Sequence, residues 1–420
     1  MERTAEDVEN TKPVTETVGR LKAPSSGEPG RTHAVGLIID YHHHYRSMFF
    51  MEMAKRLDIF VAFTSPSGLD RQGLASNIPL ELQHQTVTRY QYERVLRRPW
   101  GALVAFVKTM YVVLKHPAPI WIIHGYSNPA CYAGIVAKWL FGCKLIMWGE
   151  SNYQDHKRYR PLEWFKGTLL RYCDQVHVYG QSARDYCRWL GVPASRIYIV
   201  QPTIDERPFV PFLRCRKDPG RRRKVLYVGR FSPEKNLPRL LESLREHREV
   251  FPRTGLSLTM VGFGAQEEEL REFVSSHAMQ DLVTIRDKVQ PGEVAKVMSE
   301  HDALILPSVQ EAYGLVVLEA QWTGLPVAVS TRCGCVRDLV NPANGWLIDP
   351  GHPGSLQRVW SEIERCGSAE WEAKSRAAVA TAQAYSSARS VALTLAAIER
   401  WMRPDASQGL AELAAEGGSR

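Results

Sequence analysis

Short apolar runs alternate along the chain with longer segments of helical character. Each run is only a few residues long, which suits a strand buried on both faces. Helical stretches are predicted between them, notably at 129–141, 161–172 and 315–323. Strands that alternate with helices predict a mostly parallel sheet covered on both faces. The runs form two series: 34–40, 58–64, 119–124, 143–148, 175–179 and 196–200, then 224–228, 256–261, 282–286, 303–307, 326–330 and 345–348.

Residues 206–223 are the best candidate for a boundary between the two series. This segment is polar and basic, contains Pro and Gly, and interrupts the alternation of strands and helices, as linkers between domains often do. The expected organisation is a disordered polar arm (1–31), an N-terminal domain (32–205), this linker, a C-terminal domain (224–383), a further helix (384–402) and a flexible tail (403–420).

The stretch Glu311-Ala-Tyr-Gly-Leu-Val-Val-Leu-Glu319 joins an apolar strand to a helix and carries the strongest chemical signal. The helix begins near Gly314 and Leu315, and a helix N-terminus offers free N–H groups and a positive dipole end to a phosphate. Ionised Glu311 and Glu319 only accept hydrogen bonds, so they suit sugar or ribose hydroxyls. The spacing alone is equally consistent with one surface loop carboxylate and one solvated helix carboxylate.

Two more glycine-containing turns follow strands of the second series. Gly229-Arg230 ends one strand, and Lys235 comes shortly afterwards. An arginine fork and a lysine point charge near one helix entrance could clamp a diphosphate. The next strand ends in Gly262 and Gly264, where a nucleotide could approach the backbone closely.

In this order, Gly229-Arg230…Lys235-Asn236, Val261-Gly262-Phe263-Gly264 and the Glu311/Glu319 pair resemble the C-terminal half of the retaining nucleotide-sugar glycosyltransferases of GT-B fold, family 4. The likeness covers residues 224–349. Each piece is common alone, but the three in this order are a specific signal. The segment that begins Glu150-Ser-Asn-Tyr-Gln-Asp resembles a bacterial polysaccharide-type subgroup of the same family.

The resemblance implies an α/β protein of GT-B fold, in which two Rossmann-like parallel-sheet domains face each other across a cleft and the helix 384–402 packs back on the first. It implies transfer from a nucleoside-diphosphate sugar with retention of configuration, without a cofactor or an obligatory metal. Arg230 and Lys235 would bind the diphosphate. Glu319 would hold the ribose, and Glu311 would face the sugar. The other implied donor-site residues are Gly229, Gly262, Gly264, Tyr313, Gly314 and Leu315.

Polar residues also follow strands of the first series, at the sheet edge where α/β proteins bind ligands. Three adjacent histidines, including His43 and His44, cannot share one face of a regular element, so we expect no metal site there. These two, with His124 and Asn152, are candidates for the acceptor side. The glycine-rich loop that many relatives carry after the first strand is missing here.

Glu150 stands where many relatives have a histidine near the reacting sugar. The resemblance makes it a candidate catalytic residue that orients a sugar hydroxyl or the acceptor nucleophile. The alternative is a buried structural glutamate, because buried carboxylates need hydrogen-bonding partners.

The composition limits which classes of binding partner and which cellular compartment fit this protein. A net charge of +8 and a pI of 9.0 fit a phosphorylated substrate, anionic lipid or nucleic acid, but no aromatic-basic nucleic-acid module is present, so we expect no nucleic acid. Eight cysteines without a pairwise framework favour a reducing compartment. The N-terminus lacks the apolar core of a signal peptide, and no run of about 18 apolar residues predicts a spanning helix. A cytoplasmic location is therefore expected.

Residues 92–115 combine basic and aromatic side chains with an apolar helix over 101–114. Such a segment could rest on an anionic membrane surface beside a lipid-linked acceptor, peripherally on the inner membrane face. One core helix with a solvated charged edge explains the same pattern.

The leading hypothesis is a retaining, metal-independent glycosyltransferase that acts on a glycan or lipid-linked acceptor in cell-surface polysaccharide, such as lipopolysaccharide, or glycolipid synthesis. A storage or osmolyte glycoside synthase is a second hypothesis. A catalytically silent nucleotide-sugar-binding subunit is a third, against which the intact set Arg230, Lys235, Glu311 and Glu319 argues.

Overall fold

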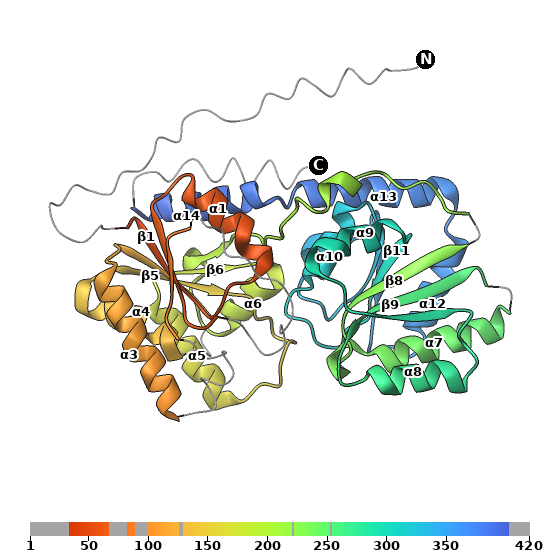
Figure 1. Cartoon of the computed structure of the whole chain (residues 1–420), viewed down its shortest axis with the longest axis horizontal. Helices are drawn as coiled ribbons and strands as arrows, with labels where there is room; N and C mark the ends of the chain where they lie inside the picture. Colours follow the sequence, from red (N-terminus) through yellow and green to blue (C-terminus); the bar gives the residue numbers. More distant parts are fainter. Residues whose placement is uncertain are drawn as a thin grey trace, which may run out of the picture.

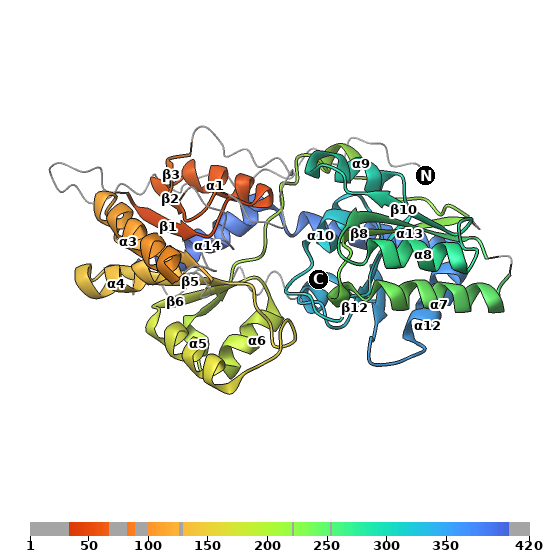
Figure 2. The same cartoon turned by 60° about the horizontal axis from the view of Figure 1, so that its bottom comes forward.

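A computed structural model of the protein describes residues 33–66, 82–88, 99–125, 129–220, 222–252 and 254–402. They form two α/β domains that lie side by side, each built on one parallel sheet (Figures 1 and 2). The first sheet has the order β3-β2-β1-β4-β5-β6-β7, with β1 Val35–Ile39, β2 Ile59–Phe63, β3 His84–Thr86, β4 Ile120–His124, β5 Lys144–Gly149, β6 Gln175–Val178 and β7 Ile197–Ile199. The second has the order β10-β9-β8-β11-β12-β13, with β8 Arg223–Arg230, β9 Leu256–Phe263, β10 Val283–Asp287, β11 Ala303–Leu306, β12 Val327–Ser330 and β13 Gly345–Ile348.

Helices cover both sheets. Those of the first domain are α1 Ser47–Ala54, α3 Pro99–Lys115, α4 Tyr132–Phe141, α5 Arg160–Tyr172 and α6 Gln181–Trp189. Those that follow are α7 Leu237–Val250, α8 Glu267–Ser276, α9 Val294–Ser299, α10 Leu315–Trp322, α11 Val336–Leu339, α12 Ser355–Arg365, α13 Ser368–Gln383 and α14 Ser387–Met402. Two of the helices run along the top of both domains in Figure 1, α13 over the second and α14 over the first.

The predicted fold class is confirmed. Every strand expected from an apolar run is present, and most of them agree to within a residue or two at each end. Among the described residues, the strand that the pattern missed is β3, which is only three residues long and consists of the polar residues His84, Gln85 and Thr86 at the edge of its sheet. An edge strand this short carries no apolar run for a sequence pattern to detect.

The basic segment 206–223 is partly built into the second domain. Arg216 donates from Nε to the carbonyl of Thr323 (2.8 Å) and from Nη1 to that of Ser299 (2.9 Å), at the C-terminal ends of α10 and α9. Arg223 donates to the carbonyl of Cys366. Cations suit helix C-termini because unpaired carbonyls and the negative dipole end lie there. These two basic residues therefore have a structural role.

The last helix belongs spatially to the first domain. Gln175 Nε2, on β6, donates to the carbonyl of Ala397 at 3.0 Å. Ser390 Oγ donates to the carbonyl of Val200 at 2.8 Å, and Val391 and Ile398 are buried. The chain thus crosses between the domains a second time through α13 and α14.

Candidate active site

The donor-side residues predicted from the sequence gather at the carboxyl ends of β8, β9 and β11. β8 and β9 pair in parallel, with Gly229 opposite Gly262. A Cβ on Gly262 would come within 1.9 Å of the Gly229 carbonyl, and one on Gly264 within 2.2 Å of the Phe231 carbonyl. Close packing of the two loops is therefore a structural reason for these glycines, independent of any nucleotide.

Gly314 is the residue from which α10 starts. Its φ of 99° lies in the left-handed region, which side-chain-bearing residues rarely adopt. Leu315 opens the helix, Tyr313 before it is buried, and Glu319 lies on the helix as a partly buried residue. The predicted strand–loop–helix arrangement is present, and it leaves the first N–H groups of α10 without helical partners.

Two cations predicted to bind the diphosphate are paired with carboxylates. Lys235 donates a hydrogen bond to Glu311 Oε2, and both side chains are largely buried. Arg230 Nη2 lies 3.2 Å from Glu234 Oε1, and 53% of the arginine side chain is exposed. The structure thus brings Lys235 and Glu311 together, while Arg230 remains accessible beside them on the same sheet edge.

The first domain carries a second polar cluster at the carboxyl ends of its central strands. Asp40 follows β1, His124 ends β4, and Glu150 follows β5. The strand order reverses between β1 and β4, and such a switch point is where open α/β sheets bind ligands.

Arg46 connects the members of this cluster. Its Nη2 lies 2.7 Å from His124 Nε2 and donates to Glu150 Oε1. His124 Nε2 lies 3.3 Å from Glu150 Oε1, and its Nδ1 lies 3.4 Å from Asp40 Oδ1. The guanidinium also sits over the Trp148 ring, 5.2 Å from its centroid. A buried cation thus lies among two carboxylates and an imidazole.

This environment fixes the charges of the carboxylates. Burial opposes ionisation of Glu150, but Arg46 and His124 outweigh it and lower its pKa to about 2. Burial likewise opposes ionisation of Asp40, yet His124 and His43 hold its pKa well below the usual value. Burial and Arg46 oppose protonation of His124, whereas Asp40 and Glu150 raise its pKa overall. Glu150 is therefore ionised at neutral pH.

Of the acceptor-side candidates, His43 and His124 belong to the polar cluster. His43 Nε2 lies 3.5 Å from Asp40 Oδ1, while the side chain of His44 lies outside the described residues.

Sequence reasoning missed Asp40 and Arg46. The signal was available, because Asp40 ends the first apolar run and Arg46 closes the histidine-rich segment after it. Among the described residues, no three His, Cys, Asp or Glu side chains are arranged to hold a metal ion.

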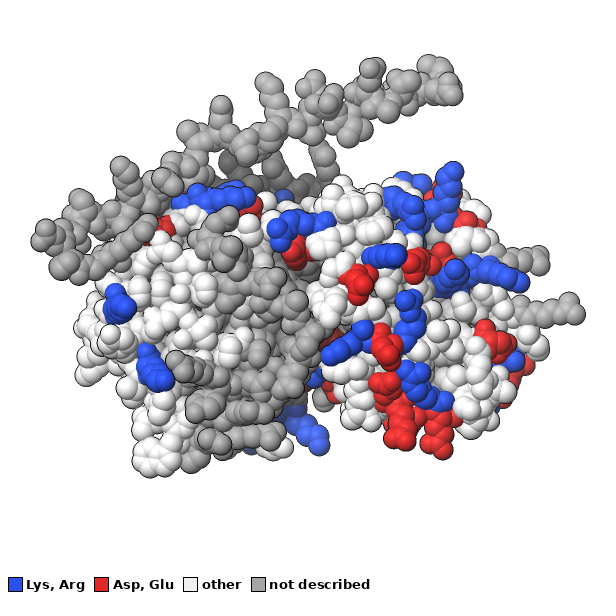
Figure 3. All heavy atoms as spheres, viewed as in Figure 1, with Lys and Arg blue, Asp and Glu red and all other residues white. Residues whose placement is uncertain are grey.

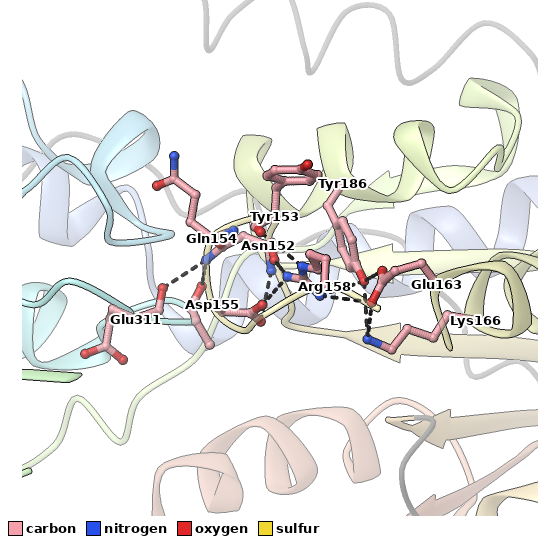
Figure 4. A network of polar contacts seen from close by, with 10 residues as sticks. Asn152, Tyr153, Gln154, Asp155, Arg158, Glu163, Lys166, Tyr186 and Glu311 are labelled. Carbon is pink, nitrogen blue, oxygen red and sulfur yellow. Dashed lines mark hydrogen bonds and ion pairs between the residues drawn. The ribbon is translucent and has the colours of Figure 1, made fainter. Parts of the chain in front are cut away.

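Asn152 joins the two domains. Its Nδ2 donates to the carbonyls of Glu311 and Ala312, both at 2.9 Å, and Figure 4 shows Asn152 next to Glu311 from the other domain. Both hydrogen bonds from the side-chain amide of Asn152 are therefore made to the second domain. Because Glu150 is two residues away, the loop that carries Glu150 touches the loop that carries Glu311.

Comparison with known proteins identifies relatives of this chain. Residues 215–380 match the family described as Glycosyl transferases group 1. The D-inositol 3-phosphate glycosyltransferase of Paenarthrobacter aurescens is 28% identical over 216 residues, 49% of this chain and 52% of that protein. The amylovoran biosynthesis glycosyltransferase AmsK of Erwinia amylovora is 25% identical over 257 residues, 58% of this chain and 60% of that protein. The chain spans about half the length of the curated relatives it matches first.

Solved structures resemble nearly the whole fold. Anabaena Alr3699/HepE, in complex with UDP and glucose, aligns with a TM-score of 0.64 at 15% identity over 87% of this chain and 98% of that one. Sucrose-phosphate synthase of Thermosynechococcus elongatus aligns with a TM-score of 0.68 at 17% identity over 88% and 98%. The protein thus has the GT-B fold. Its C-terminal half is similar to the group 1 glycosyltransferases.

Proposed function

We propose that this protein is a retaining glycosyltransferase that moves a sugar from a nucleoside-diphosphate sugar to a glycan or lipid-linked acceptor in cell-surface polysaccharide or glycolipid synthesis. The observation that carries the proposal is the contact between the two loops that bear acidic residues. Through Asn152, the Glu150 loop of the first domain meets the Glu311 loop of the second. One site can therefore present the donor cations and an ionised carboxylate of the other domain to the same sugar.

The donor half would stabilise the departing diphosphate. As the sugar becomes oxocarbenium-like, negative charge builds up on the diphosphate, and fixed donors aimed at it lower the barrier. Arg230, Lys235 and the free N–H groups near Gly314 supply such donors without a metal. Glu319 is proposed to hold the ribose. That HepE was solved with UDP and glucose supports a nucleotide-sugar in this half.

Donor binding would separate Lys235 from its present partner. A diphosphate oxygen that approaches Lys235 competes with Glu311 for the ammonium. Released from the pair, Glu311 would be free to accept hydrogen bonds from hydroxyls of the donor sugar. The pair therefore holds both side chains in place before the donor arrives.

On the opposite side, Glu150 would position a sugar hydroxyl or the acceptor nucleophile. It is ionised, and Arg46 fixes its orientation from behind. Retention of configuration would follow from attack on the same face from which the diphosphate leaves. Closure of the domains would exclude water, which protects the activated sugar from hydrolysis.

A lipid-linked acceptor is supported by an exposed apolar face on the first domain. Residues on one stripe of α3 are exposed at helical spacing, while Ala105, Val112 and Val113 on the other side are buried. α4 packs beside α3, and both views show the two helices next to each other (Figures 1 and 2). The exposed apolar residues of this α3–α4 face are Trp100, Leu103, Val104, Val107, Tyr111, Leu114, Trp139, Leu140 and Phe141.

The charges around the α3–α4 face suit an anionic lipid surface. Lys108 and Lys115 are exposed on α3, and the left side of Figure 3 is mostly white with isolated blue side chains. Aromatic and apolar groups that flank lysines bind the interface of an anionic bilayer. Within the described residues, no helix is both long and apolar enough to cross a bilayer. The contact proposed here is peripheral. Arg97 and Arg98 of the predicted membrane segment lie outside the described residues.

Donor binding and hydrolysis test the core of the proposal. A thermal-shift screen against UDP-, GDP-, ADP- and dTDP-sugars should give one responding nucleotide, unaffected by EDTA. A ligand at 100 times its dissociation constant should add about 2.7 kcal/mol of apparent stability. Slow hydrolysis of the responding donor should accompany it. Binding without hydrolysis or transfer would favour the silent-subunit alternative, and no response to any donor would contradict the proposal.

A storage or osmolyte glycoside synthase is the second candidate, favoured by the likeness to sucrose-phosphate synthase. The same donor assay separates the two candidates once acceptors are added. Transfer to a soluble sugar or sugar phosphate would support the synthase, whereas transfer only in the presence of lipid-linked saccharides would support the leading proposal.

A further inference from the structure

A pocket of about 350 Å³ opens between the two domains, beyond the Asn152 contact. Asn152, Tyr153 and α6 form its wall on the first domain, and residues 331–337 form its wall on the second. Its volume lies within the range of small-molecule sites. Asn152 also contacts the backbone of Glu311, so this pocket adjoins the proposed active site but does not contain its donor residues.

Two exposed aromatic rings form a corner in this pocket. Tyr153 and Trp189 are 53% and 54% exposed, and their rings meet at 83° with centroids 5.1 Å apart. Tyr186 lies nearly parallel to Trp189 at 6.0 Å. Tyr186 is buried, so it backs one face of the indole and leaves the rest of the ring accessible.

A polar network lies behind this corner, and it includes Tyr153 and Tyr186 (Figure 4). Arg158 Nε donates to the carbonyl of Tyr153 at 3.0 Å, and its Nη1 donates to the Tyr186 hydroxyl at 2.8 Å. Tyr186 in turn donates to Glu163, and Lys166 donates to the same carboxyl group at 2.9 Å. Anchoring the Tyr153 backbone and the Tyr186 ring before a ligand arrives lowers the conformational entropy that binding costs.

Charged side chains face the aromatic corner from both domains. Arg337 Nη1 donates to Asp185 Oδ2 at 2.6 Å, across the domain boundary. Arg332 also lines the pocket, and its exposed side chain has no ion pair within the part of the chain that the structure describes. The pocket is therefore lined by the Asp185–Arg337 ion pair and the Arg332 guanidinium as well as by the two aromatic rings.

We propose that this pocket binds a sugar ring of the acceptor glycan, a step that rests on the proposed function. The apolar C–H face of a sugar packs on an aromatic ring, and its hydroxyls pair with planar carboxylate and guanidinium groups. A lipid tail would offer no hydrogen-bond partner to Arg332 and would cover the Asp185–Arg337 ion pair, and desolvating charged groups without new polar partners is costly. A ligand here touches both domains and so favours their closed arrangement, which links acceptor recognition to closure over the donor.

Saturation-transfer NMR on the full chain tests the pocket directly. The probes are maltose, lactose, N-acetylglucosamine and glucuronate, with UDP present in a parallel sample. At least one sugar should receive saturation on its ring protons. Trp189→Ala and Tyr153→Ala should each reduce that transfer about fivefold or more, the size expected for a lost aromatic contact. Trp164→Ala, at an exposed tryptophan outside the pocket, should leave it unchanged.

The outcomes separate this inference from the proposed function. If UDP binds and donor is hydrolysed, but no sugar binds or the two pocket variants bind it like the native protein, the pocket assignment is wrong and the proposed function stands. If UDP itself loses saturation in Trp189→Ala, the corner stacks the nucleotide base and the assignment is also wrong. Sugar binding lost in both variants, with UDP binding retained, supports the acceptor pocket.

Discussion

Arg46 and Glu150 form an ion pair in which the arginine side chain is fully buried while 27% of the glutamate side chain is exposed. The carboxylate is thus the member of the pair that solvent or a substrate can reach. Removing a guanidinium from this position would leave Glu150 and Asp40 without their buried cation. Breaking a buried pair by taking away one partner is far more damaging than breaking an exposed one.

The variant Arg46→Met should therefore lower the free energy of unfolding by about 3 kcal/mol. It should also raise the pKa of Glu150, since Arg46 is the strongest of the groups that lower it. Urea unfolding followed by circular dichroism measures the first effect. The matched control is Arg245→Met on α7, where the arginine pairs with Glu242 and Glu249 at the surface and the cost should stay below about 1 kcal/mol. Equal losses in both variants would contradict the role given to Arg46.

The donor half could be predicted from the sequence because its signals are local. The transition from an apolar run to a helix predicts that Gly314 lies at the helix start. Lys235 comes shortly after the first strand of its domain. The ion pair of Arg46 with Glu150 joins residues 104 positions apart, and no local pattern contains such a pairing. The sequence identifies Asn152 only as a polar residue after a strand, because its partners belong to the other domain.

The helix α3 shows a different limit of sequence patterns. Its apolar residues occupy two faces, one buried through Val112 and Val113 and one exposed through Val104 and Val107. Periodicity predicts the helix but cannot say which face meets the core when both are apolar. Only the packing of α3 against its neighbours reveals the face that is left uncovered.

Arg230→Ala and Lys235→Ala should each slow donor hydrolysis by about 10²-fold or more, because each removes a fixed cation from the developing diphosphate charge. Their effects on stability should differ. Lys235→Ala leaves the largely buried Glu311 without its partner, whereas Arg230 is half exposed and its loss should be almost neutral. Initial rates and melting temperatures of both variants provide the comparison.

Arg239→Ala serves as the control for these two variants. Arg239 lies on α7 and pairs with Glu246 at 2.9 Å, in no part of the proposed site. Its donor hydrolysis should match that of the native protein. Near-native turnover in both Arg230→Ala and Lys235→Ala would remove the diphosphate assignment.

The α3–α4 face should bind vesicles that contain anionic lipid. Val107→Glu and Tyr111→Glu each place a carboxylate in the middle of this face, where insertion would bury it and the lipid charge would repel it. Each should weaken partitioning by about tenfold or more in a sedimentation assay. Val250→Glu, at an exposed valine of the second domain, should bind like the native protein. If native protein stays in the supernatant, or all three variants sediment equally, the α3–α4 face is not a membrane surface.

Asp338 makes the contact between the domains sensitive to pH. Both of its carboxylate oxygens lie 3.2 Å from the backbone nitrogen of Gln181, which donates to them at the start of α6 in the other domain. Burial raises the pKa of Asp338 from 3.8 to about 6. Because the folded-state pKa is the higher one, the folded protein holds an extra proton between these two values. The contribution of Asp338 to stability is therefore greatest below about pH 4 and is lost as pH rises through 6.

Asp338→Asn keeps an oxygen that can accept from Gln181 but removes this titration. As pH rises over this window, the titration of Asp338 should lower the free energy of unfolding of the native protein by up to about 3 kcal/mol. The variant should show no such decrease. The variant should therefore be at least as stable as the native protein at neutral pH. Urea unfolding of both proteins at a series of pH values gives the difference directly. Asp287→Asn removes a carboxylate that is 90% exposed, and its profile should follow the native one; if the Asp338→Asn profile does so too, the buried carboxylate does not control the pH response.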